Sequence, residues 1–227
     1  MEFKKLSRES ILNGQIQALA EAKSHALQLL SDEDRAVLIT ESLAAAPAGE
    51  PMRVFAYGSL IWNPAMNVSA RYAAMLRGYQ RRFCFWTILG RGCEQNPGLM
   101  LGLEPGGQCE GVVYEIADHE VESEMDILFR REMISNVYIP TWVDVECGGN
   151  VHKALTFIVN VNSERYCAEL TPATRVRHIA TARGQLGNNR DYLLNLVDHL
   201  GELEIHDAHM ESLAAAVREY LALDHSG

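Results

Sequence analysis

Two short segments of the sequence carry residues that could do chemistry. The first is residues 54–62, which read VFAYGSLIW: a β-rich run that breaks at Gly58-Ser59. A strand that enters a Gly-Ser turn can leave consecutive backbone N–H groups pointing at one spot, where they bind an anion. A plain β-turn explains the same residues equally well. The segment alone leaves both interpretations open.

The second segment is residues 128–133, LFRREM, in which Glu132 stands out. It lies near the predicted end of a helix with acidic residues early and Arg130 and Arg131 late. The helix dipole disfavours a carboxylate at that end. Apolar neighbours in the sequence should also raise its pKa, which suits a general base. The alternative is a surface glutamate paired with Arg130 or Arg131, and this too stays open.

Other signatures of catalysis or metal binding are weak. The sequence holds no P-loop, no dinucleotide fingerprint, no nucleophile elbow and no zinc-protease motif. His206 and His209 could share a helix face, but no acid or cysteine cluster completes a metal site, which favours a solvated helix start. A second acidic cluster is assigned to a solvated helix face; its members are Glu120, Glu122, Glu124 and Asp126.

The composition limits the partners of the chain. Of its 227 residues, 48% are hydrophobic, and its formal charge of −10 disfavours nucleic acid and anionic membrane surfaces. The five cysteines form no CxxC pair, so thiols in a reducing cytosol are expected rather than a disulfide framework. The sequence shows no targeting leader and no apolar run of about 20 residues. These features predict a soluble, cytoplasmic protein.

The elements that must position the two segments fall into three blocks. Residues 1–50 predict a helical extension, with a second helix capped by Ser31, followed by a Pro-rich linker. Residues 51–227 predict one domain, which begins with strands and ends with helices. The expected strands are residues 53–57, 82–87, 99–103, 110–114, 138–146 and 152–159, the last two forming a hairpin. The expected helices are residues 118–133, 172–183, 189–200 and 207–223. This order predicts an α+β domain on a mostly antiparallel sheet or small barrel.

Together the two segments resemble the ChaC family, the glutathione-specific γ-glutamylcyclotransferases of the wider γ-glutamylcyclotransferase-like fold. Residues 54–62 match the family element V-F-G-Y-G-S-L-I-W, with Ala56 in place of a glycine. Arg131-Glu132 and Tyr138 match its R-E and G-x-Y elements, with Asn136 where a glycine is usual. Further matches follow in the same order at residues 90–92, 96–98, 111–114 and 187–193, so the resemblance covers roughly residues 50–200.

The resemblance implies a fold, an activity and a set of site residues. The fold is a small mixed β-barrel with flanking helices, and the family needs no metal or cofactor. Glu132 would remove a proton from the α-amine of glutathione, which then attacks the γ-carbonyl to give 5-oxoproline and cysteinylglycine. Arg91 and Tyr138 would help to position the carboxylates of the substrate. The residues implied to bind its γ-glutamyl end are Val54, Phe55, Ala56, Tyr57, Gly58, Ser59 and Leu60.

Three departures from the family pattern bear on the substrate. Ala56 adds a methyl group beside the substrate loop, and Phe157 lacks the hydroxyl of a pocket tyrosine found in some animal members. Leu99 replaces an arginine that is common after Pro-Gly. Two alternatives therefore accompany the glutathione reaction: cyclisation of another γ-glutamyl amine or peptide, and a non-catalytic binding module of the same fold. The sequence predicts no oligomeric state.

Overall fold

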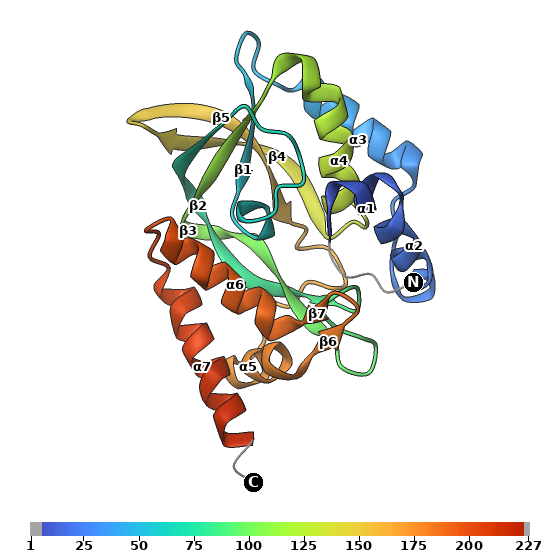
Figure 1. Cartoon of the computed structure of the whole chain (residues 1–227), viewed down its shortest axis with the longest axis vertical. Coiled ribbons are helices and arrows are strands. Elements are labelled where there is room, and N and C mark those ends of the chain that lie inside the picture. Colours follow the sequence, from blue (N-terminus) through green and yellow to red (C-terminus); the bar gives the residue numbers. More distant parts are fainter. Residues whose placement is uncertain (1–5, 225–227) are drawn as a thin grey trace. The chain divides into compact units, whose positions relative to one another are not determined.

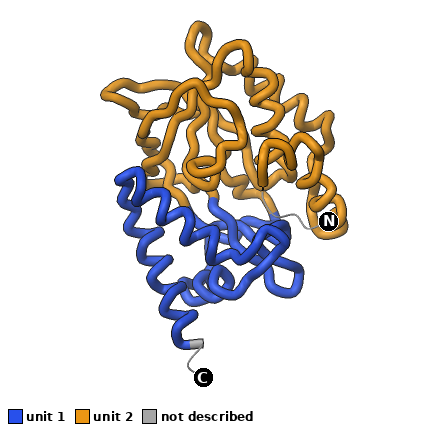
Figure 2. Tube along the Cα trace, in the orientation of Figure 1, with its two compact units in different colours: residues 1–5, 82–101, 164–227 blue, residues 6–81, 102–163 orange. Residues whose placement is uncertain are grey.

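The computed structural model describes residues 6–224 (Figure 1). Its contacts divide the chain into two compact units, shown in Figure 2. One unit combines residues 82–101 with the C-terminal part from residue 164, and the other combines residues 6–81 with 102–163. The helices before residue 50 fall in the second unit, with most of the barrel. The division into an extension, 1–50, and a domain, 51–227, stays a prediction.

Five strands form a closed barrel in the order β1-β3-β2-β4-β5. They are β1 (Met52–Ala56), β2 (Ala70–Thr87), β3 (Gly98–Ile116), β4 (Tyr138–Cys147) and β5 (Asn150–Val159). β1 pairs antiparallel with β3, from Met52↔Ile116 to Ala56↔Val112, and parallel with β5 at Val54↔Leu155. This confirms the predicted α+β fold with a small, mostly antiparallel barrel.

Two strands are longer than predicted. β2 has 18 residues where only residues 82–87 were expected, and β3 has 19 residues where two separate strands were expected. Pro and Gly residues such as Pro105-Gly106-Gly107 are typical of a break between strands, but β3 runs through them. Gly106 and Gly107 have positive φ values of 110° and 66° in an exposed stretch. A glycine bulge bends a strand without ending it, as barrel closure requires.

The hairpin of β4 and β5 follows its prediction. The two strands pair from Tyr138↔Val159 to Cys147↔Asn150. Gly148 and Gly149, the two residues between them, have φ values of 56° and 81°. A two-residue turn with positive φ at both positions matches the twist of the flanking strands, and glycine adopts it without strain.

The barrel unit also holds the N-terminal helices and the helix that carries Glu132. These elements are α1 (Arg8–Leu12), α2 (Gln15–Glu21), η1 (Ser24–Ala26), α3 (Asp32–Ala44), η2 (Ser59–Ile61), η3 (Asp118–Glu120) and α4 (Val121–Glu132). Ser31 caps α3 as predicted, in a reciprocal capping box with Asp34. The helix expected from residue 118 begins later: Asp118 lies in the 3₁₀ turn η3, and α4 begins at Val121. Helices α3 and α4 lie side by side (Figure 1).

The other unit is mainly helical. It holds α5 (Pro172–Thr181), α6 (Asn189–Glu202) and α7 (Ala208–Asp224), with the short strands β6 (Arg183–Gly184) and β7 (Gly187–Asn188). Thr171 caps α5 with Pro172 at its first position, as predicted. The Asn189 side chain accepts a hydrogen bond from the Leu99 N–H through Oδ1 and donates one to the Leu99 carbonyl through Nδ2, both at 2.8 Å. In residues 6–224, no helix has the length and apolar character that a membrane crossing needs.

Candidate active site

The turn after β1 is held by its carbonyl groups. The Tyr114 hydroxyl donates to the carbonyls of Leu60 and Ile61, at 3.1 and 2.9 Å. Arg81 Nη1 donates to the carbonyl of Tyr57 at 2.9 Å. Both donor side chains are buried. Burial raises the pKa of Tyr114, so its hydroxyl keeps the proton that it donates.

The N–H groups of the same turn have no hydrogen-bond acceptor among the described residues. Gly58, Ser59 and Leu60 are the residues at the start of η2, where a helix has no internal partner for its first donors. Within the described part of the chain, their N–H groups donate no hydrogen bond to another residue. Three successive donors on a fixed turn form the kind of nest that binds an anion or a developing oxyanion.

Glu132 is the last residue of α4 and is mostly buried. Its side chain is 15% exposed, and its Oε1 lies 2.9 Å from Nε of Arg131. Burial raises the pKa of Glu132, and the charge and hydrogen bond of Arg131 oppose this rise without cancelling it. The predicted raised pKa is therefore confirmed. The alternative was correct about a pairing with Arg131 but wrong about a surface position.

Arg131 connects the turn to Glu132. Its buried guanidinium donates through Nη2 to the Ser59 hydroxyl at 2.9 Å and through Nη1 to the Asn63 carbonyl. Its third nitrogen, Nε, faces Glu132. The planar fork of an arginine suits such a three-way contact. Arg131 was not among the predicted site residues, because its contacts with Ser59 and Asn63 join segments about 70 residues apart and leave no local signal in the sequence.

Aromatic rings pack behind the end of α4. The Tyr57 hydroxyl donates to the carbonyl of Phe157 at 2.8 Å. The Phe157 ring meets Phe129 of α4 edge-on at 5.5 Å, and Tyr138 at 6.5 Å. Phe129 precedes Glu132 by about one helical turn. The cluster thus connects the turn after β1, Tyr138 and the end of α4. Phe157 contributes a buried ring to it.

Several predicted site residues lie apart from this arrangement or are enclosed by the core. Val54, Phe55 and Ala56 are completely buried in β1. Arg91 belongs to the other unit, where its Nη1 donates to the Asn188 carbonyl at 3.1 Å. Burial lowers the pKa of Arg91, although Tyr192 and Asp191 oppose this shift. The roles of all four in substrate binding stay predictions.

One acid of α4 contradicts its assignment to a solvated face. The Glu124 side chain is 0% exposed. Arg8 donates to both of its oxygens, at 2.5 and 2.7 Å, and the Asn67 N–H donates at 2.9 Å. The assignment fails because the partner, Arg8, lies 116 residues away in the sequence. No helical spacing could reveal that contact.

A metal site finds no support in residues 6–224. No group of three His, Cys, Asp or Glu side chains in this range is placed to hold an ion. His206 is exposed and lies before α7, which begins at Ala208, so it does not share that helix with His209. Its Nδ1 lies 3.8 Å from the Glu211 carboxylate.

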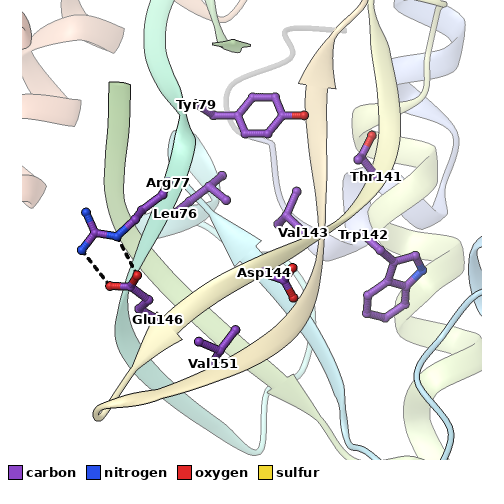
Figure 3. Close-up of a pocket in the computed structure, with 9 residues that line it drawn as sticks. All are labelled: Leu76, Arg77, Tyr79, Thr141, Trp142, Val143, Asp144, Glu146 and Val151. Carbon is purple, nitrogen blue, oxygen red and sulfur yellow. Dashed lines mark hydrogen bonds and ion pairs between the residues drawn. The ribbon is translucent and has the colours of Figure 1, made fainter. Parts of the chain in front are cut away.

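A cavity of about 350 Å³ lies elsewhere in the barrel unit, along β2 and β4 (Figure 3). Arg77 and Glu146 form an ion pair at one side of it, with N–O distances of 2.6 and 2.9 Å. None of the predicted site residues lines it. We therefore locate the candidate site at the turn and the end of α4, not at this cavity.

Comparisons with known proteins identify the family of the chain. The model of the ChaC-like protein family matches residues 52–220. The glutathione-specific gamma-glutamylcyclotransferase of Escherichia coli (strain K12) is 34% identical over 96% of this chain and 94% of its own length. Glutathione-specific gamma-glutamylcyclotransferase 1 of Danio rerio is 28% identical over 72% of this chain and 87% of its own.

A solved structure shows the same fold. A yeast γ-glutamyl cyclotransferase specific to glutathione superimposes with a TM-score of 0.70 at 22% identity, covering 76% of this chain and 97% of its own. The family model and the E. coli relative confirm the resemblance to the ChaC family. This chain belongs to the ChaC-like protein family.

Proposed function

We propose that this chain is a γ-glutamylcyclotransferase that converts glutathione to 5-oxoproline and cysteinylglycine in the cytoplasm. The names of the E. coli and fish relatives support the activity and the substrate. One observation carries the proposal: a single buried guanidinium, Arg131, contacts both a turn with three available N–H donors and a buried carboxylate.

The reaction needs a base but no nucleophile from the protein. The α-amine of the γ-glutamyl group loses a proton to Glu132, and its nitrogen then bonds to the γ-carbonyl carbon. The amide C–N bond breaks, and the proton returns to the departing amine of cysteinylglycine. Because nucleophile and carbonyl belong to one molecule, holding them in a reactive geometry is worth an effective concentration on the order of 10⁵ M or more.

The raised pKa of Glu132 suits this proton transfer. An ordinary carboxylate, with a pKa of about 4.3, is a poor base for an amine at neutral pH. Burial raises the pKa of Glu132 toward that of the amine, which improves the match between donor and acceptor. Arg131 opposes the rise in the pKa of Glu132 and so favours the ionised carboxylate, which is the form that accepts the proton.

The turn would stabilise the charge that develops on the carbonyl oxygen. The N–H groups of Gly58, Ser59 and Leu60 are the proposed donors, since Tyr114 and Arg81 already hold the carbonyls of the same turn. Donors that need no rearrangement are worth about 10²–10³ in rate each. The backbone of β1, with Tyr138, would position the rest of the substrate.

The test is a comparison of γ-glutamyl substrates with purified full-length protein. Glutathione, γ-glutamylcysteine and γ-glutamylalanine are incubated in parallel, and 5-oxoproline and the released amine are measured by mass spectrometry. We expect both products from glutathione alone. Products from the other two at comparable rates would move the assignment to a broader γ-glutamyl cyclotransferase. If none of the three substrates gave a product, the enzymatic assignment would be wrong, and the non-catalytic binding module would be the remaining interpretation.

A further inference from the structure

Two of the five cysteines face each other in the helical unit. Cys84 lies near the end of β2, and Cys167 lies in the segment that precedes α5. This segment pairs antiparallel with β2 at Phe85↔Tyr166. The Cys167 N–H donates to the Cys84 carbonyl at 2.7 Å, and the Trp86 N–H donates to the Arg165 carbonyl at 2.8 Å. The register therefore places Cys84 directly opposite Cys167.

This register gives the two cysteines the backbone spacing that a disulfide requires. Opposite residues in a hydrogen-bonded antiparallel pair have Cα atoms about 5.5 Å apart, and their side chains share one face. A disulfide spans Cα separations of about 4.4–6.8 Å. Its Cβ atoms must come closer than they do in a relaxed pair, so the bond would form with some strain. Strained disulfides are reduced readily, which makes them reversible.

Side chains on both sides hold the register. Buried Arg175 of α5 donates to the Phe83 carbonyl at 3.1 Å and to the Ala168 carbonyl at 3.4 Å. It thereby ties together the residues that flank the cysteines on one side. On the other side, the Arg165 guanidinium lies over the Phe85 ring at 5.6 Å from its centre. The segment cannot slide along β2 without breaking these contacts.

The two thiols differ in access. Cys84 is completely buried, whereas Cys167 is partly exposed. A dissolved disulfide would thus meet Cys167 first, and Cys84 would be the thiol that completes the exchange. This is the arrangement of an attacking and a resolving cysteine.

We propose that Cys84 and Cys167 form a redox-active dithiol that closes by exchange with a small-molecule disulfide, such as glutathione disulfide. The Cys167 thiolate attacks one sulfur of that disulfide, forms a mixed disulfide and releases one glutathione. Cys84 then loses its proton and attacks the Cys167 sulfur, which releases the second glutathione. Two protein thiols are oxidised and one dissolved disulfide is reduced to two thiols. This dithiol does not depend on the proposed activity.

The experiment exposes folded full-length protein to glutathione disulfide, alkylates the remaining thiols and digests the protein with trypsin. Cleavage at arginine releases residues 83–91 and 166–175, each with one cysteine of the pair. We expect these two peptides to be joined, with the loss of two hydrogen atoms, and to separate after dithiothreitol. Protein oxidised in denaturant serves as a reference, in which the five cysteines pair at random.

Three variants separate the steps. Cys84→Ser should retain glutathione on Cys167 as a stable mixed disulfide, because the resolving thiol is gone. Cys167→Ser should leave Cys84 unmodified in the folded protein. Cys147→Ser, at the β4–β5 hairpin, should form the bridge as the unaltered protein does. Alkylation of both peptides after oxidation, or a folded-state bridge that uses other cysteines, would overturn the proposal.

Discussion

Helix α4 carries two buried glutamates with opposite properties. Glu124, in the first turns, is completely buried and accepts hydrogen bonds from Arg8, from the Asn67 N–H and from Ser123. Burial alone would raise its pKa, but these partners together lower it. Glu132, at the end of the same helix, has one charged partner, Arg131, and burial raises its pKa. One helix thus holds a fixed anion and a carboxylate that can exchange a proton.

The difference comes from how completely each acid is compensated. A carboxylate has about four sites that accept hydrogen bonds, and Glu124 has partners for most of them near the favourable N-terminal end of the helix. Glu132 lies where the dipole disfavours its charge, and its pairing with Arg131 leaves capacity for a substrate proton. We therefore treat Glu124 as a structural residue and Glu132 as the proposed base.

Replacing the proposed base should have the largest effect. Glu132→Gln preserves shape but removes proton transfer, so kcat should fall about 10³-fold while glutathione still binds. Rates of 5-oxoproline formation and the dissociation constant, measured by calorimetry, check both parts. Glu122→Gln, exposed on the same helix, is the matched control and should be fully active. Normal turnover by the Glu132 variant would show that another group is the base.

The same substitution at Glu124 should act on stability instead. Glu124→Gln leaves Arg8 without its anion and weakens hydrogen bonds inside the unit, so the free energy of unfolding should fall by about 2 kcal/mol. Turnover at a temperature where the variant is folded should change less than about threefold. Urea unfolding followed by circular dichroism, with kcat measured alongside, separates the two effects. A large loss of kcat with unchanged stability would reverse the comparison.

Sequence reasoning predicted the helix-end position and the raised pKa of Glu132 correctly, because the signals for both are local. A helix end, apolar neighbours and the R-E element all lie within a few residues of it, just as Cys147-Gly148-Gly149-Asn150 predicted the hairpin. Glu124 depends on Arg8, and Arg131 acquires its role only when Ser59 folds against it. Contacts between distant segments leave no periodicity in the sequence. The sequence did not predict that β3 continues through its glycines, because that continuity depends on pairing with distant strands.

Arg131 makes a smaller and more specific prediction about the proposed base. Arg131→Gln removes the positive charge that opposes the raised pKa of Glu132, so the acidic limb of the kcat/KM profile should move to higher pH. It also frees Ser59, and kcat/KM at neutral pH should fall roughly tenfold. Arg130→Gln is the control, since Arg130 pairs with Asp126 on the outer side of the helix. A uniform loss of activity without movement of the limb would assign Arg131 a structural role only.

The smallest predicted effect is on the pH dependence of stability, where Glu124 and Glu132 should contribute with opposite signs to the free energy of unfolding. In the unfolded chain both titrate near pH 4.3. The raised folded pKa of Glu132 means that its charge destabilises the fold, fully above that pKa and not at all below about pH 4.3. Glu132→Gln should therefore raise Tm at neutral pH, by an amount worth under about 1 kcal/mol because Arg131 loses its partner.

Glu124 should show the opposite pattern. Its lowered folded pKa means that it stabilises the fold above about pH 4.3, and that this stabilisation is lost as the pH falls through the folded pKa. The Tm of Glu124→Gln should lie below that of the unaltered protein at neutral pH, and this difference should become smaller in acid. The Tm of Glu132→Gln should lie above it at neutral pH, and this difference should also become smaller in acid. Calorimetric scans on both variants from about pH 2 to 8, a range that extends well below pH 4.3, measure this. If Glu132→Gln is instead less stable than the unaltered protein at pH 7, the pairing with Arg131 outweighs burial. Glu132 would then be a second structural acid, and the contrast along α4 would disappear.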